Sequence, residues 1–189
     1  MSVSWCQSFS GKKVTPLDLK PEQVDLESVA HHLALKCRFG GACREFYSVA
    51  EHCVRGSRLI APSYRLAFLL HEVDEVYLDD IRRPIKPHLA LTGLMLNELT
   101  ISWSVLAGRH EQTILVALGH ASLCPLVASP EVKAMDNAML AWEARDLMGP
   151  SPEPWEGAVE PPPGVEILTP WPWQQAEREW LDLYAALVG

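Results

Sequence analysis

The feature that most constrains the fold is a run of acidic residues and one histidine placed directly behind an apolar segment. The apolar segment spans residues 64–70, and the polar run spans residues 71–80. Apolar spacing predicts a helix here, so His71 and Glu75 are expected to share a face, with Glu72 on an adjacent edge. Buried carboxylates are costly unless a counter-charge or a metal ion compensates them. The run therefore indicates a divalent-cation site in a helical core, or else a solvated helix end without function.

Apolar periodicity predicts further helices on both sides of this run. They are expected at residues 26–36, 47–60, 89–106, 111–123, 132–148 and 173–187. Ser48 is a candidate N-cap, and Ser129-Pro130-Glu131 is a strong helix start because it combines a cap, a first-turn proline and an acid. Neither convincing β alternation nor an internal repeat is present, so the predicted fold class is all-α.

Length and composition fit one compact domain, or one domain with an appendage. The 189 residues, 48% of them hydrophobic, suffice to bury a core. Residues 1–27 are rich in turn formers and predict an irregular N-terminal arm. Residues 149–172 are dense in proline and predict an extended segment. We therefore expect a domain at 1–148, a Pro-rich segment at 149–172 and a helix at 173–189 that packs on the domain.

Net charge and cysteine usage indicate which partners and which cellular compartment to expect. A net charge of -8 argues against non-specific nucleic-acid binding. The five cysteines are scattered without a CxxC pair, and the N-terminus does not read as a signal region, which indicates a cytosolic protein with reduced thiols. No apolar run reaches the length of a membrane span. Residues 89–106 and 111–123 are more apolar than one monomer face needs, so we expect a homo-oligomer.

Motifs of several other chemistries are missing. The chain has no Walker-type loop, GxGxxG, GxSxG or HExxH. What remains is His52 and His71 on consecutive predicted helices, together with acids on two helices. Asp136, flanked by Met135 and Met139, is the acid of the later helix that is best placed to point inward.

This order of residues resembles the HD-domain metal-dependent phosphohydrolases. Their pattern is a histidine on one helix, a His-Asp doublet on the next and a distant aspartate on a later one, and this chain presents His52, then His71-Glu72, then Asp136. The likeness is closer to the deoxynucleotidase-like branch, which includes bacterial 5′-deoxynucleotidases and phage dATP triphosphohydrolases. It is carried by residues 38–41, 46–52, 69–80, 83–86 and 143–147.

The resemblance implies an HD-domain helical bundle and a role for each matching residue. It makes the metal ligands His52, His71, Glu72 and Asp136, for a divalent ion such as Mn, Mg, Co or Zn. It makes Glu75 the acid that positions or deprotonates water and places Asp80 near the substrate sugar. A metal held by imidazoles and carboxylates can polarise a phosphoryl oxygen, and a nearby carboxylate can accept a proton.

Basic and aromatic residues complete the expected site. The candidates to meet phosphate are Arg38, Arg44 and Lys86, with Arg83 as a fourth. For each of them a solvated surface charge is the alternative. Phe39 or Tyr47 is a candidate to stack on a base, with core packing as the alternative.

Glu72 departs from the resemblance, because the family has aspartate in its defining doublet. Glutamate keeps the charge and the oxygen donors but adds a methylene, so metal affinity, metal identity and turnover depend on this position.

The expected function is hydrolysis of a deoxynucleotide at a phosphate ester, releasing nucleoside and triphosphate from a dATP-like dNTP. The alternatives are a 5′-deoxynucleotidase acting on monophosphates and a nucleotide-binding protein without catalysis.

Overall fold

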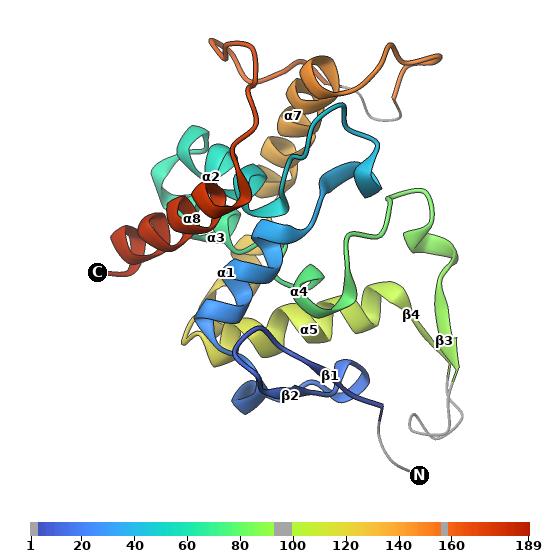
Figure 1. Ribbon diagram of the computed structural model, residues 1–189, viewed down its shortest axis with the longest axis vertical. Coiled ribbons are helices and arrows are strands. Elements are labelled where there is room, and N and C mark those ends of the chain that lie inside the picture. Colours follow the sequence, from blue (N-terminus) through green and yellow to red (C-terminus); the bar gives the residue numbers. More distant parts are fainter. Residues whose placement is uncertain (1–3, 93–99, 156–158) are drawn as a thin grey trace.

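The computed structural model describes residues 4–92, 100–155 and 159–189, and most of this part of the chain is helical (Figure 1). The helices are α1 (Leu26–Leu35), α2 (Val49–Leu59), α3 (Arg65–Leu69), α4 (Glu75–Leu78), α5 (Trp103–Ala117), α6 (Cys124–Val127), α7 (Pro130–Leu147) and α8 (Trp173–Val188). The predicted predominance of helix is confirmed. α7 and α8 begin and end within a few residues of their predicted bounds.

Short antiparallel strands occur at two places. In the N-terminal arm β1 (Cys6–Gln7) pairs with β2 (Lys13–Val14), and ahead of α5 β3 (Ala90–Thr92) pairs with β4 (Thr100–Ser102). The helix predicted at residues 89–106 is therefore wrong over 90–92 and 100–102, which are paired strands. Residues 93–99 lie outside the described residues, and only 103–106 are helical, as the first turn of α5. β-Branched residues in both strands favour the extended backbone. The homo-oligomer stays a prediction, with less apolar helix surface to support it.

The acidic run is not one helix. α3 ends at Leu69, residues 70–74 form turns, and α4 begins at Glu75. The ring Nδ1 of His71 lies 2.6 Å from the carbonyl oxygen of Phe68, the acceptor that a continuing helix would offer to the amide of Glu72. The break turns Glu72 towards the same space as His71, whereas a regular helix would place it on an adjacent edge.

Hydroxyl caps fix where the two helices that carry site residues begin. Ser48 Oγ accepts a hydrogen bond from the amide of Glu51 at 3.0 Å, and Ser129 Oγ accepts one from the amide of Val132 at 3.3 Å. Both predicted caps are confirmed. Such a cap stabilises a helix by about 1 kcal/mol and fixes its first residue. It thereby sets which positions of α2 and α7 face the interior.

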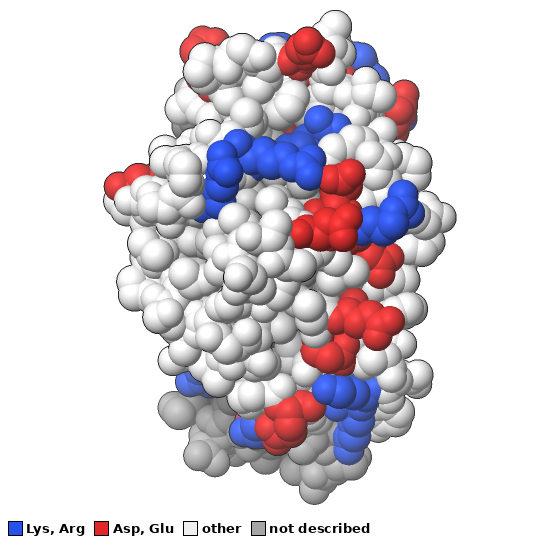
Figure 2. Space-filling view, turned by 90° about the vertical axis from the view of Figure 1, so that its left-hand side faces the viewer, with Lys and Arg blue, Asp and Glu red and all other residues white. Residues whose placement is uncertain are grey.

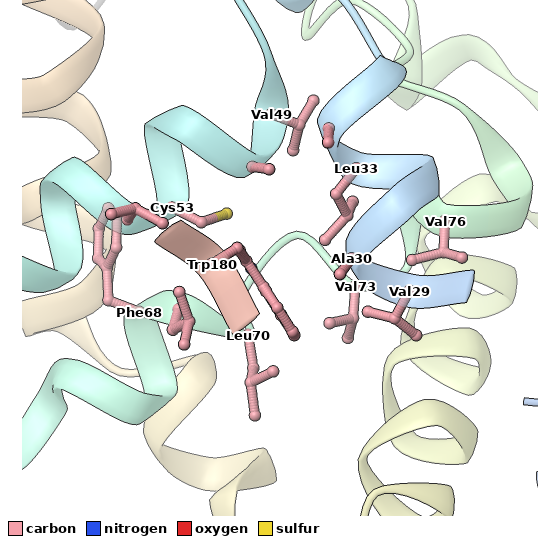
Figure 3. Packing of buried hydrophobic residues seen from close by; sticks show 14 of the residues in the cluster. Val29, Ala30, Leu33, Val49, Cys53, Phe68, Leu70, Val73, Val76 and Trp180 are labelled. Atoms are coloured by element: carbon pink, nitrogen blue, oxygen red, sulfur yellow. The ribbon is translucent and has the colours of Figure 1, made fainter. Parts of the chain in front are cut away.

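The core is completed by the C-terminal helix. Trp180 of α8 is fully buried, and Figure 3 shows its ring among side chains from α1, α2 and the segment around α3. Leu33, Cys53 and Phe68, all without exposed surface, belong to the same cluster. α8 therefore supplies part of the central core.

The Pro-rich segment contains no helix or strand in its described parts, 149–155 and 159–172. Hydrogen bonds nevertheless fasten it to the domain. The indole nitrogen of Trp142 donates to the carbonyl oxygen of Glu166 at 2.9 Å, and Arg55 donates to that of Thr169 at 2.8 Å. The guanidinium of Arg55 also lies over the ring of Trp171, 4.4 Å from its centroid. The segment is thus held against α2 and α7 before it enters α8.

Surface charge is mixed on the side of the molecule where α8 ends. Figure 2 shows acidic and basic groups of both signs interspersed along part of this face, next to a broad uncharged area. A short band of basic groups crosses the upper part of this view and ends beside acidic groups. Among the helices of the described residues, none combines the length and the apolarity needed to span a bilayer.

Candidate metal centre

Four side chains from three parts of the chain converge on one point. His52 comes from α2, His71 and Glu72 from the turn after α3, and Asp136 from α7. One donor atom of each lies within 4.8 Å of the donor atoms of all the others. His52 Nε2 lies 3.4 Å from Asp136 Oδ1, and His71 Nε2 lies 3.5 Å from Glu72 Oε1. The structure therefore brings together all four residues predicted as metal ligands.

The two imidazoles are oriented so that their Nε2 atoms face each other at 3.3 Å. The opposite nitrogen of each ring already has an acceptor: Nδ1 of His52 lies 2.6 Å from Glu143 Oε1, and Nδ1 of His71 lies 2.6 Å from the carbonyl oxygen of Phe68. A carbonyl oxygen can only accept, so Nδ1 of His71 carries the proton. In the neutral rings both Nε2 lone pairs then point into the shared space, which favours a cation between them.

The carboxylates of Glu72 and Asp136 favour a positive charge at the centre of the four residues. Burial lowers the pKa of His71, but Glu72 and Asp136 raise it well above its ordinary value. Burial raises the pKa of Asp136, yet its hydrogen bonds to the two imidazoles lower it well below the usual range. A proton on His71 or a metal ion would supply the missing charge. Two imidazole nitrogens and two carboxylate oxygens form a donor set that suits a divalent transition metal.

Glu143 supports the cluster from behind and was not predicted as a site residue. It is fully buried; Oε1 accepts from the hydroxyl of Tyr47 at 3.0 Å as well as from His52, and Oε2 accepts from Arg38 Nε at 3.1 Å. Burial raises its pKa, but Arg38 and His52 bring it below the ordinary value. One sequence signal marks this residue: it follows Asp136 by seven positions, two helical turns, so the two acids share a face of α7.

Arg38 links the cluster to its support. It is 8% exposed, and besides Glu143 it reaches Glu72 Oε1 at 3.4 Å and Asp136 Oδ1 at 4.0 Å. It begins the 3-10 turn Arg38–Gly41, in which Phe39 and Gly40 both have a φ of 58°. This left-handed backbone lets the chain reverse directly after Arg38.

Glu75 and Lys86 lie next to the cluster. Glu75 is 2% exposed, and its Oε1 accepts from Lys86 Nζ at 3.3 Å, so its ion-pair partner is Lys86. Its Oε2 is buried and has no hydrogen-bond partner among the described residues. Burial and then the charges of Glu72 and Asp80 raise the pKa of Glu75 well above its ordinary value.

The remaining basic candidates lie in different places. Arg83 donates to Asp136 Oδ2 at 3.1 Å and to the side chain of Asn137 at 3.0 Å, at the edge of the cluster. The side chain of Arg44 is exposed and lines a hollow of about 450 Å³ beside α7, together with Trp155.

The two aromatic residues predicted as candidates for base stacking lie in different surroundings. Tyr47 is fully buried, with its hydroxyl on Glu143, so the prediction that it stacks on a base is wrong and its ring belongs to the core. Phe39 is half-buried between the guanidinium of Arg38, 5.7 Å from its ring centroid, and the ring of Trp155 at 5.9 Å.

Asp80, predicted as catalytic, lines a second and larger hollow of about 640 Å³ formed by the N-terminal arm, α1 and the residues after α4. The four cluster residues do not line this hollow. Asp80 is nevertheless close enough to Glu75 for its charge to raise the pKa of that group.

Two known proteins are similar in sequence to this chain. The chain is 31% identical over 145 residues to the uncharacterized protein YfdR of Escherichia coli (strain K12), covering 77% of this chain and 73% of YfdR. It is 27% identical over 158 residues to an uncharacterized protein of Rhodobacter capsulatus, covering 79% of this chain and 76% of that protein. No protein-family model matches the chain. Its identity to YfdR over nearly three quarters of that protein places the chain in the YfdR family.

Proposed function

We propose that this chain is a metal-dependent phosphohydrolase of deoxynucleotides, built on an HD-type helical bundle. The observation that carries the proposal is the convergence of His52, His71, Glu72 and Asp136, whose donor atoms all lie within 4.8 Å of one another. A purely structural bundle has no need of two facing imidazoles and two carboxylates at one partly buried point.

The donor set fits a divalent ion such as Mn, Mg, Co or Zn, held by those four residues. When bound, the ion would polarise a phosphoryl oxygen and lower the pKa of a water molecule. Glu72 suits this role in place of aspartate, because its longer side chain still brings Oε1 to within 3.5 Å of His71 Nε2. Arg38, 3.4 Å from the same oxygen, orients it.

Glu75 is the residue that accepts a proton from the attacking water. Its Oε1 is held by Lys86, and its Oε2 has no partner among the described residues, so one oxygen is left to take the proton. The water oxygen bonds to the phosphorus next to the sugar, the bond from phosphorus to the 5′-oxygen breaks, and the proton that Glu75 took from the water passes to that oxygen as the nucleoside leaves. Arg38 and Lys86 offset the negative charge of the phosphate.

The triphosphate and monophosphate substrates are favoured by different observations. The loop after α4 brings Arg83 to Asp136 and Lys86 to Glu75, and the side chain of Arg83 is 60% exposed, which favours the more highly charged triphosphate of a dATP-like nucleotide. Arg83 and Lys86 each already contact a carboxylate, which favours a monophosphate and the alternative function of a 5′-deoxynucleotidase.

A product assay tests the proposal. Metal-stripped protein receives each dNTP or dNMP with Mg, Mn, Co or Zn, and nucleoside, phosphate and triphosphate are resolved. Nucleoside with triphosphate identifies a triphosphohydrolase, and nucleoside with phosphate identifies a nucleotidase. Nucleotide binding without product under any metal would contradict hydrolysis and favour the non-catalytic alternative, with Glu72→Asp as the variant to examine.

A second arm assigns the mechanism. Glu75→Gln should abolish turnover while metal and nucleotide still bind, because the variant keeps the shape of the side chain but cannot accept the proton. Glu131→Gln, an exposed acid in the first turn of α7, is the matched control and should keep full turnover. Unchanged turnover in Glu75→Gln would remove Glu75 from the mechanism.

A further inference from the structure

The larger hollow, of about 640 Å³, has no part in the chemistry above. Its walls come from the N-terminal arm, from α1 and from the residues after α4, and include Phe9, His31, Leu35, Lys36, Asp79 and Asp80. Its volume is within the range of about 300–1,000 Å³ that is usual for small-molecule pockets.

Two residues of the hollow connect it to the surroundings of the cluster. Cys37 directly precedes Arg38, which reaches Glu72, and Asp80 is near enough to Glu75 for its charge to raise the pKa of that group.

One wall of the hollow is a preformed aromatic platform. The ring of Phe9 stacks on His31, with centroids 3.6 Å apart and planes 18° from parallel, yet Phe9 remains 48% exposed. His31 is itself held from α8, by an edge contact to Trp173 at 5.5 Å and by Glu177 at 3.3 Å. A flat apolar surface that is fixed from behind and open in front is what a planar ring needs for stacking.

The arm that carries Phe9 is fixed by His32. The backbone amide of Phe9 donates to Nε2 of His32 at 3.2 Å, so Nδ1 carries the proton and donates to the carbonyl oxygen of Val76 at 3.1 Å. One histidine thereby ties the N-terminal arm to α1 and to α4. The platform is rigid before any ligand arrives, which lowers the entropy lost on binding.

The rim of the hollow presents a donor and an acceptor side by side. Lys36 Nζ forms an ion pair with Asp79, whose side chain is 80% exposed. Asp79 has a φ of 67°, a backbone conformation that costs a residue other than glycine energy and is often kept at binding sites. Nucleobases carry hydrogen-bond donors and acceptors on one edge, which such a pair can match.

We propose that this hollow receives the nucleoside half of the substrate, with the base stacked on Phe9 and its edge at Lys36 and Asp79. The proposal rests on the proposed function, because it assumes that the phosphate end lies at the cluster of four. It adds the residues that recognise the uncharged part of the substrate.

Nucleosides without phosphate separate the two proposals. Deoxyadenosine, deoxyguanosine, deoxycytidine and thymidine are each titrated into the metal-stripped full chain, and binding is followed by calorimetry and by protein NMR. Phe9→Ala should weaken the best of them about 10-fold, the loss expected for one base stacked on an aromatic ring. Asp79→Asn, which tolerates the same backbone, should weaken it as well. Phe46→Ala, 39% exposed and outside the hollow, is the matched control and should bind as the wild type does.

The outcomes are distinguishable. Nucleoside binding that depends on Phe9, in a protein that hydrolyses no nucleotide with any metal, would uphold this site and refute the proposed hydrolysis. Hydrolysis with the same KM in Phe9→Ala and the wild type, together with equal or absent nucleoside binding, would overturn this site and leave the hydrolysis standing.

Discussion

Replacing Glu143 by glutamine removes the charge that supports the metal centre and changes little else. In the structure this buried carboxylate accepts hydrogen bonds from His52, Tyr47 and Arg38, at 2.6, 3.0 and 3.1 Å. Glutamine has one carbonyl oxygen in place of two charged oxygens, so at least one of these donors loses its acceptor. Arg38 then lies buried with less compensation.

The expected size follows from these contacts. Removing one partner of a buried ion pair costs about 3–5 kcal/mol, and the retained amide places Glu143→Gln near the lower end, at about 3 kcal/mol. Loss of the carboxylate that orients a ligating histidine lowers metal affinity by about 10- to 100-fold. Tyr47→Phe removes a single hydrogen bond and leaves the charge, so it should cost about 1 kcal/mol and barely change metal affinity.

Two measurements check this prediction. Urea unfolding in the presence of a chelator gives the free energy of unfolding without the contribution of bound metal. Calorimetric titration with Mn or Zn then gives the metal affinity of each folded variant. A folded Glu143→Gln protein with the metal affinity of the wild type would refute the idea that Glu143 orients His52.

Three further predictions concern the fold. Trp180→Ala should lower the free energy of unfolding by about 3–5 kcal/mol in urea, because its ring fills the core, whereas Ile167→Ala, at an 82% exposed position, should change little. Gly56→Ala should destabilise by about 1–3 kcal/mol, since its new Cβ would lie 2.1 Å from the ring of Phe68; a wild-type melting temperature would show that the ring yields. Burial lowers the pKa of His110 below its ordinary 6.5, so the unfolded chain binds the proton first as pH falls. Its stabilising contribution is complete above about pH 6.5 and is lost below it, and His110→Gln should show a smaller loss of stability between pH 7.5 and 5.5 than the wild type does.

The sequence predicted correctly those features that depend on neighbouring residues, such as helix caps. Ser48 and Ser129 cap helices as expected, because a hydroxyl before an apolar-periodic stretch satisfies the free amides of the first turn. The four predicted ligands also lie together. They were selected because their order along the chain resembles that of the HD-domain phosphohydrolases, although their separation of up to 84 positions gives no distance.

The features that were missed depend on contacts between distant segments. The helix expected through residues 64–80 breaks because His71 takes the carbonyl of Phe68, which no periodicity reveals. Glu143 looked like any acid of an amphipathic helix, and only its encounter with Arg38, over a hundred positions away, makes it a buried ion-pair partner. The buried hydroxyl of Tyr47 donates to the same carboxylate, and this contact is not visible in the sequence either. Residues 89–106 are mostly apolar, and a short apolar run cannot be assigned to helix or strand by periodicity alone.

The most direct test of the metal-dependent hydrolysis is a titration of metal-stripped protein with Mn²⁺, in which bound ion and hydrolysis of deoxynucleotide are followed in the same samples. We predict no turnover without metal, and turnover that rises in proportion to bound ion and saturates at one ion per chain. His71→Ala should show neither tight binding nor turnover. Full turnover in the stripped protein, or an unchanged metal complement in His71→Ala, would contradict the assignment of these four residues as the metal centre.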